Sequence, residues 1–240
     1  MEQAIAKAND VNAMLRQNGF DPDKEMDNTL PHATGLDLPR VRIEIKDSGA
    51  HRLYIDWGES YDNANQREYY LPDNKLEGVI ISNQRIRAFW KDGDTIPSCS
   101  SIDGIIRSEN PVSSNCLKCP EAVVGEGNCK PKERLLLIAK IEGQIIPLLL
   151  ALPPTSIKHF EAHKRRLMRS KLPLIAVNTV MSLTPVKKNG YNWGEILFSI
   201  NGVADKEMLT VAKQARDQLR RFTEGIGSSD YSEAGDKAAD

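Results

Sequence analysis

The four cysteines of this 240-residue chain all fall within one window of 31 residues, as Cys99, Cys116, Cys119 and Cys129. Their pattern is C-x16-C-x2-C-x9-C. A C-x2-C pair places two thiolates on one tight turn, where they can fill two corners of a tetrahedron around zinc, and two further thiolates complete a closed structural site. The residues at the start of the chain lack a signal-peptide pattern, which favours a cytoplasmic, reducing setting in which clustered cysteines bind metal sooner than they form disulfides.

Other interpretations of the cysteines and histidines stay open. In one interpretation the thiols are free or form an isolated redox pair. In another interpretation they ligate an iron–sulfur cluster. A catalytic zinc is disfavoured because four cysteines leave no open position. The sequence His159-Phe160-Glu161 supplies the H-x-E of zinc deaminases, but it follows the C-x2-C instead of preceding it. His159 and His163 share a helix face, and we interpret them as solvated residues on a basic helix.

The hydrophobic pattern predicts a β-rich α+β fold. Strand patterns cover 40–47, 51–58, 67–71 and 77–90, and two hairpins are expected over 134–152 and 174–202, with turns at Glu142-Gly143 and Asn189-Gly190. Pro147 is then expected at an edge or a bulge. Helices are expected over 2–17, over 156–172 with Thr155 or Ser156 as the cap, and over 204–222. We predict an OB-like barrel or a strongly bent antiparallel sheet with a four-cysteine zinc-ribbon insertion and peripheral helices.

Charge and composition divide the chain into three parts. Residues 1–34 are read as a helix and linker, 35–222 as the body with the zinc insertion at 97–133, and 223–240 as a disordered acidic tail. The net charge of −1 includes −3 for residues 1–30 and −4 for 223–240, which leaves +6 for residues 31–222. A basic body suggests a polyanionic partner, although mixed charge that merely keeps a surface soluble explains it equally well.

Aromatic and cationic residues alternate along several segments. Aromatic rings stack on unpaired bases of any sequence while neighbouring cations contact phosphates. The helix expected at 156–172 presents Ile157, Phe160, Leu167 and Met168 to the core and its cations outward. The candidate nucleic-acid residues are Tyr54, Trp57, Tyr61, Tyr69, Tyr70, Arg85, Arg87, Phe89, Trp90, Lys91, Lys158, Arg165, Arg166, Arg169, Lys187, Lys188, Tyr191 and Trp193. Core packing of the rings and a solvated helix face are the competing interpretations.

The order of these features resembles a family. A β-rich start, C-x16-C-x2-C-P, a glycine-containing loop, an apolar hairpin, LPPTS and a long helix are similar to single-stranded-DNA-binding proteins of phages and mobile elements. This resemblance implies an OB-type fold, structural Zn2+ on Cys99, Cys116, Cys119 and Cys129, and sequence-tolerant, non-enzymatic binding of single strands in replication or recombination. It also implies an acidic tail that recruits replication or recombination proteins, although this tail lacks a terminal aromatic residue.

Two other function classes remain. In the first class, the chain is a zinc-ribbon adaptor that binds proteins in a replication or transcription complex. In the second class, the chain is a metal-dependent nucleic-acid-processing enzyme in which Asp92 and Asp94 hold magnesium. The sequence D-G-D is also an ordinary turn.

Overall fold

The computed structural model describes residues 13, 16, 38–46, 48–58, 67–91, 97–123 and 127–219, with the side chains of 217–219 excepted. Met1–Leu36 and Asp37–Asp240 form separate units, and every strand and helix named below lies in the second. Several sequence predictions lie outside the described residues: the helix at 2–17 with its linker, Tyr61, Asp92, Asp94 and the acidic tail at 223–240.

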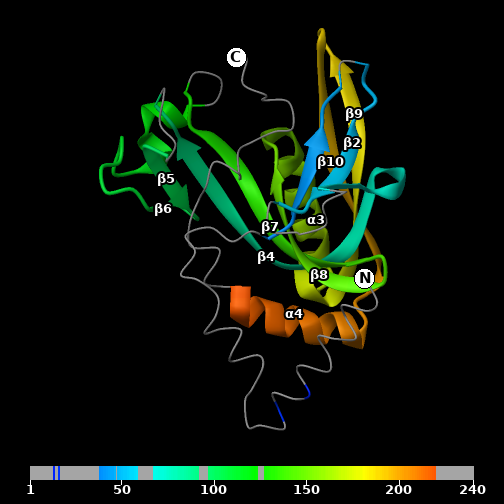
Figure 1. Cartoon of the computed structure of the whole chain (residues 1–240). Helices are drawn as coiled ribbons and strands as arrows, with labels where there is room; N and C mark the ends of the chain where they lie inside the picture. The colour runs from blue at the N-terminus through cyan, green and yellow to red at the C-terminus, as the bar shows by residue number, and fades with distance from the viewer. Residues whose placement is uncertain are drawn as a thin grey trace. The chain divides into compact units, whose positions relative to one another are not determined.

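Where the structure describes it, the second unit is strand-rich with two α-helices, which confirms the expected α+β class (Figure 1). Its elements are β1 (Arg40–Glu44), β2 (Arg52–Asp56), β3 (Glu68–Tyr70), η1 (Pro72–Asn74), β4 (Lys75–Phe89), β5 (Cys99–Ile102), β6 (Ile105–Ile106), η2 (Cys116–Lys118), η3 (Pro120–Ala122), β7 (Lys130–Ile141), β8 (Gln144–Leu152), α3 (Pro154–Arg169), η4 (Leu174–Ala176), β9 (Val177–Lys188), β10 (Tyr191–Val203) and α4 (Lys206–Leu219).

The ten strands of the described residues form one sheet in the order β10-β9-β4-β7-β8-β1-β2-β3, with β5 added beside β4 and β6 beside β5. Its pairs are antiparallel except β1 with β8. Within the described residues β10 and β3 do not pair, so the sheet is open and does not close into the barrel that was expected as one alternative. The sheet nevertheless curls back on itself, because Ile43 of β1 lies against Gly194 of β10 and the His51 side chain bonds Asn192.

Both predicted hairpins are confirmed, and their turns explain them. Glu142 and Gly143 have φ of 49° and 84°, and Asn189 and Gly190 have φ of 53° and 81°. Two consecutive left-handed residues match the twist of the flanking strands in a two-residue turn. Pro147 pairs with Ile138 of β7 on a part of β8 that β1 does not reach, so it lies at an edge as expected.

Helix α3 covers the edge of β10 and packs on β7 and β8 (Figure 1). It begins at Pro154 after Pro153, so the expected cap at Thr155 or Ser156 is wrong. Ser156 lies inside the helix, where its Oγ accepts the N–H of Ile196 at 2.9 Å. This bond satisfies a backbone donor on the outer side of β10 that has no strand partner.

The buried stripe of α3 consists of Ser156, Phe160, His163 and Leu167. Spacings of four, three and four residues put these side chains on one face. Met168 lies one residue past that face and is 74% exposed, so its predicted core position is wrong. His163 is buried, not solvated as expected: its ring packs 5.7 Å from that of Phe198, and its Nε2 lies 3.4 Å from the Thr179 hydroxyl.

His163 makes the stability of the fold depend on pH. Burial and then the charge of Arg166 lower its pKa below the usual 6.5. As the pH falls through 6.5, the unfolded chain takes up a proton that the folded chain does not bind, so we expect this group to destabilise the protein progressively by up to ~1.4 kcal/mol per pH unit. Urea unfolding between pH 7.5 and 5.5 measures the effect, and His163→Leu removes it. Equal pH slopes for the two proteins would contradict this prediction.

Candidate metal centre and nucleic-acid interface

All four cysteines line one small cavity at the end of the β4–β7 pair. Cys99 begins β5 opposite Phe89 of β4, and Cys129 directly precedes β7 on the other side of β4. Cys116 and Cys119 come from the loop between β6 and β7. The cavity measures about 10 Å3, which is room for one water-sized sphere. The four thiols form no disulfides, and they share one pocket large enough for a single ion.

Short-range bonds fold the loop over this cavity. The Asn115 side chain accepts the N–H of Leu117 at 2.9 Å and caps the turn η2 that carries Cys116. Pro120 begins η3, and the N–H of Cys129 bonds the carbonyl of Glu121 at 2.8 Å. These turns return the chain to β7 and place the C-x2-C pair over the other two cysteines.

The chemistry of the donor set, four thiols that line one cavity, fits a four-thiolate metal ion. Cys99 and Cys119 are buried and the other two cysteines are half-buried. Burial raises the pKa of Cys129, the nearby Arg87 lowers it, and the sulfurs of Cys99 and Cys119 raise it. In the described part of the chain, however, no three His, Cys, Asp or Glu side chains have the arrangement of a metal site. The four thiols thus line one cavity without forming the arrangement of a metal site.

Gly127 is essential to the closing turn of this loop. A Cβ at this position would stand 2.1 Å from the carbonyl oxygen of Glu121, the same oxygen that accepts the Cys129 N–H. Since this neighbour is backbone, we expect Gly127→Ala to displace Cys129 and to cost about 1–3 kcal/mol of stability. Chemical denaturation measures the loss, with Lys118→Ala as an exposed control in the same insertion. Unchanged stability in Gly127→Ala would contradict this reading of the turn.

The β9–β10 hairpin presents aromatic rings and cations at its tip. Tyr191 directly follows the turn, is 75% exposed and pairs across the hairpin with Lys188. Trp193 lies two residues on, so it shares a sheet face with Tyr191, and it is half-buried. Lys187 is exposed on the opposite face. The tip is tied to the β1–β2 turn, because Asn192 bonds His51 and the carbonyl of Lys46 at 2.9 Å each.

Glu195 holds this hairpin to α3. Its buried carboxylate accepts hydrogen bonds from Lys158 Nζ at 3.0 Å, His159 Nε2 at 2.7 Å and Trp193 Nε1 at 3.1 Å. Burial raises the pKa of Glu195, but these three bonds and the charge of Lys158 outweigh it and hold the pKa below the usual range. The bonds fix the Trp193 indole and the first turn of α3 against each other.

Three cations form a stripe along the outward side of α3. Lys158, Arg165 and Arg169 are spaced seven and four residues apart, so they share one face, which lies away from the buried stripe. All three are exposed. The stripe starts at Lys158, beside Trp193, and extends about 16 Å at the helical rise of 1.5 Å per residue. Arg166 is exposed on an adjacent position.

A second aromatic group lies on β2 and β3. The rings of Tyr54 and Tyr70 are 5.5 Å apart, and the Arg52 guanidinium lies 3.8 Å over the Tyr70 ring. Tyr54 is only 5% exposed, and burial and the Glu68 charge raise its pKa to about 12. Tyr54 therefore offers no free face for stacking, whereas Tyr70 is half-buried. Arg52 was missed from the sequence because a cation–π contact has no spacing signature across strands.

The remaining predicted residues are not gathered at one surface. Trp57 and Tyr69 pack against the core, and Phe89 and Trp90 are half-buried. Arg85 is ion-paired to Glu133 at 3.2 Å and Glu161 at 3.0 Å. Lys91 is exposed at the end of β4. Arg87 was expected to contact phosphates but lines the cysteine cavity. The β9–β10 tip and α3 therefore carry most of the exposed candidates.

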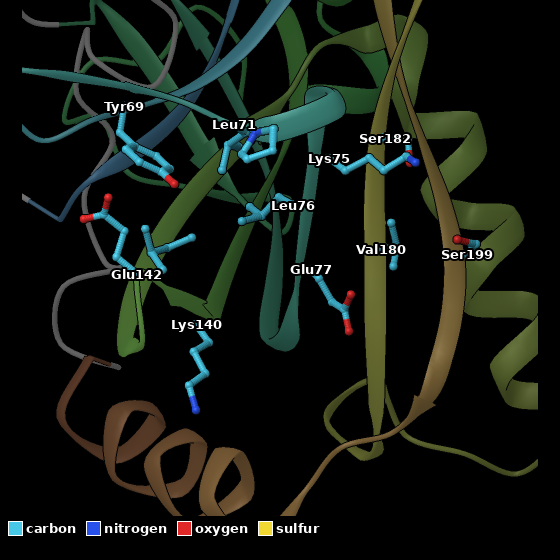
Figure 2. A pocket seen from close by; sticks show the side chains of 12 residues that line it. Tyr69, Leu71, Lys75, Leu76, Glu77, Lys140, Glu142, Val180, Ser182 and Ser199 are labelled. Carbon is cyan, nitrogen blue, oxygen red and sulfur yellow. The ribbon is translucent and has the colours of Figure 1, made fainter.

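A groove of about 590 Å3 crosses the sheet near the start of β4. Figure 2 shows Tyr69 and Glu142 at one end and Ser182 and Ser199 at the other, with Lys75 between them. Its two lysines, Lys75 and Lys140, are balanced by Glu77 and Glu142. With no surplus of positive charge the groove does not favour phosphates, so we do not include it in the interface.

Comparisons with protein-family models, with curated proteins and with solved structures found no match. None of the described helices has the length and apolar character needed to cross a membrane.

Proposed function

We propose that the chain binds single-stranded DNA with little regard to sequence and protects it during replication or recombination, as in phages and mobile elements. It does so without catalysis, and a zinc ion on Cys99, Cys116, Cys119 and Cys129 stabilises the insertion. The observation that carries this proposal is the β9–β10 tip, where Tyr191 and Trp193 share one face beside Lys188.

The spacing of the two rings suits unpaired bases. Residues two apart on a strand stand about 6.6–6.8 Å apart. Each ring offers a flat apolar surface, and every base has a face that stacks on it, so binding of this kind tolerates any sequence. Trp193 is held by Glu195 before a ligand arrives, so little conformational freedom is lost on stacking.

Cations extend the platform in two directions. Lys188 stands across the hairpin from Tyr191, and the stripe of Lys158, Arg165 and Arg169 leads away along α3. Phosphates along this path would release counterions, so the affinity should fall as salt rises. The acidic residues 223–240 would compete for the same cations and recruit partner proteins, which remains a proposal from the sequence.

The proposal is tested by fluorescence anisotropy of labelled 20-nucleotide oligomers. Single strands of different sequence should bind with similar affinity and a steep dependence on salt, and duplex of the same length should bind more weakly. RNA strands of matched sequence measure the preference between the two nucleic acids. No binding at low salt would refute the proposed function.

A protein-binding adaptor is the second candidate, and one observation favours it. Apolar side chains on the insertion are exposed: Leu117 is 94% exposed and Ile105 is 60% exposed. Exposed apolar residues at one end of a molecule are typical of protein interfaces. Absence of oligonucleotide binding, with a stable fold and bound zinc, would favour this candidate.

A further inference from the structure

Arg87 occupies an unexpected position beneath the cysteines. It lies in β4, pairing with Ser101 of β5 on one side and Pro131 of β7 on the other. Its backbone therefore lies between the strand that begins at Cys99 and the strand that follows Cys129. Its side chain lines the cavity together with all four cysteines.

The surroundings of the Arg87 guanidinium leave room for a further hydrogen-bond acceptor, such as an anion. Its Nη1 atom is buried and has no hydrogen-bond partner among the described residues. The same guanidinium hydrogen-bonds the Cys129 thiol, so it faces sulfur. An arginine is always charged, and leaving one of its N–H groups buried and unpaired is costly.

Four thiolates with one zinc ion supply such an anion. Zinc contributes two positive charges and the thiolates four negative ones, so the closed centre carries a net charge of −2. Outer-shell hydrogen bonds to ligating sulfurs offset that charge and orient the ligands. An arginine suits this role better than a lysine, because its planar fork directs several N–H groups at fixed angles.

We infer that Arg87 is a positioning residue of the zinc centre, which donates N–H groups to the thiolate sulfurs and neutralises part of their charge. This inference rests on the zinc half of the proposed function. It removes Arg87 from the nucleic-acid interface and gives the buried Nη1 atom near the end of β4 a partner. Zinc and Arg87 together then hold β5, the loop and β7 around one point.

The test compares zinc affinities of the full-length protein by competition with a chromogenic chelator. Arg87→Gln should bind zinc about 10–100-fold more weakly than the unmodified protein. Arg87→Lys keeps the charge with fewer directed donors and should fall between the two. Arg107→Gln removes an exposed cation from the same insertion and should leave the affinity unchanged. Substitution with Co2+ adds a spectroscopic readout, since loss of N–H donors should shift the sulfur-to-cobalt charge-transfer band.

Each result decides the inference. Equal zinc affinity in Arg87→Gln and the unmodified protein would overturn it, as would Arg87→Lys binding no better than Arg87→Gln. If Arg87→Gln fails to fold, the zinc affinity and the cobalt band of Arg87→Lys decide whether Arg87 has this role. An affinity and a band equal to those of the unmodified protein would count against it. Absence of zinc binding by the unmodified protein would refute the zinc half of the proposed function as well, while the oligonucleotide titration tests the other half separately.

Discussion

Replacing Tyr191 and Trp193 together by alanine is expected to weaken binding of a single-stranded 20-nucleotide oligomer by at least about 30-fold. Each ring that stacks on a base contributes roughly 1–3 kcal/mol, so two rings contribute at least about 2 kcal/mol. Fluorescence anisotropy at one fixed salt concentration measures the loss. Tyr191→Ala alone should account for at least about 5-fold, and it leaves the folded core intact because this side chain is 75% exposed.

Two further variants separate stacking from charge and from general damage. Val203→Ala shortens an apolar side chain that is 77% exposed at the other end of β10, and it should leave the affinity unchanged. Lys188→Gln should weaken binding and reduce the slope of log affinity against log salt by about 0.7, the value for one phosphate contact on a single strand. Unmodified affinity in the double aromatic variant would show that the strand does not stack at this tip.

Replacing Cys116 by serine is expected to cost the protein its zinc and the order of its insertion. A hydroxyl is a far poorer zinc ligand than a thiolate, so the affinity should fall by more than the ~10–100-fold that loss of an outer-shell partner costs. Native mass spectrometry should count one zinc in the unmodified chain and none in the variant. Hydrogen exchange should accelerate in residues 97–123 while β9 and β10 keep their protection.

Leu117→Ala is the matched control for this change. Leu117 directly follows Cys116, is 94% exposed and packs on nothing that the substitution would disturb. Its zinc content and exchange rates should equal those of the unmodified protein. If the Cys116→Ser variant and the unmodified protein show the same exchange pattern and neither contains metal, the insertion folds without zinc.

Turn chemistry made the hairpins predictable. Gly143, Asn189 and Gly190 occupy left-handed backbone positions that glycine and asparagine readily adopt. The flanking strands alternate or run apolar as sheet residues do. The start of α3 was missed for a tertiary reason. Ser156 has a side chain suited to a helix cap, but its hydroxyl instead accepts a hydrogen bond from the N–H of Ile196 on β10.

The site was only partly predictable from sequence. The cysteine pattern indicated which thiols come together, and they do line one cavity. Alternation in β4 indicates which residues share a face, but it does not say that a loop 30 residues downstream covers the face with Arg87. Glu195 carried no sequence signal at all, since its three donors come from α3 and from its own strand.

The most direct test of the proposed interface follows the fluorescence of Trp193 alone. Trp57→Phe and Trp90→Phe together leave it as the single tryptophan of the chain. Adding an unlabelled single-stranded oligomer at low salt should quench its emission to saturation, and added salt should restore the signal. Emission that stays constant while anisotropy reports bound oligomer would place the strand elsewhere and contradict the account.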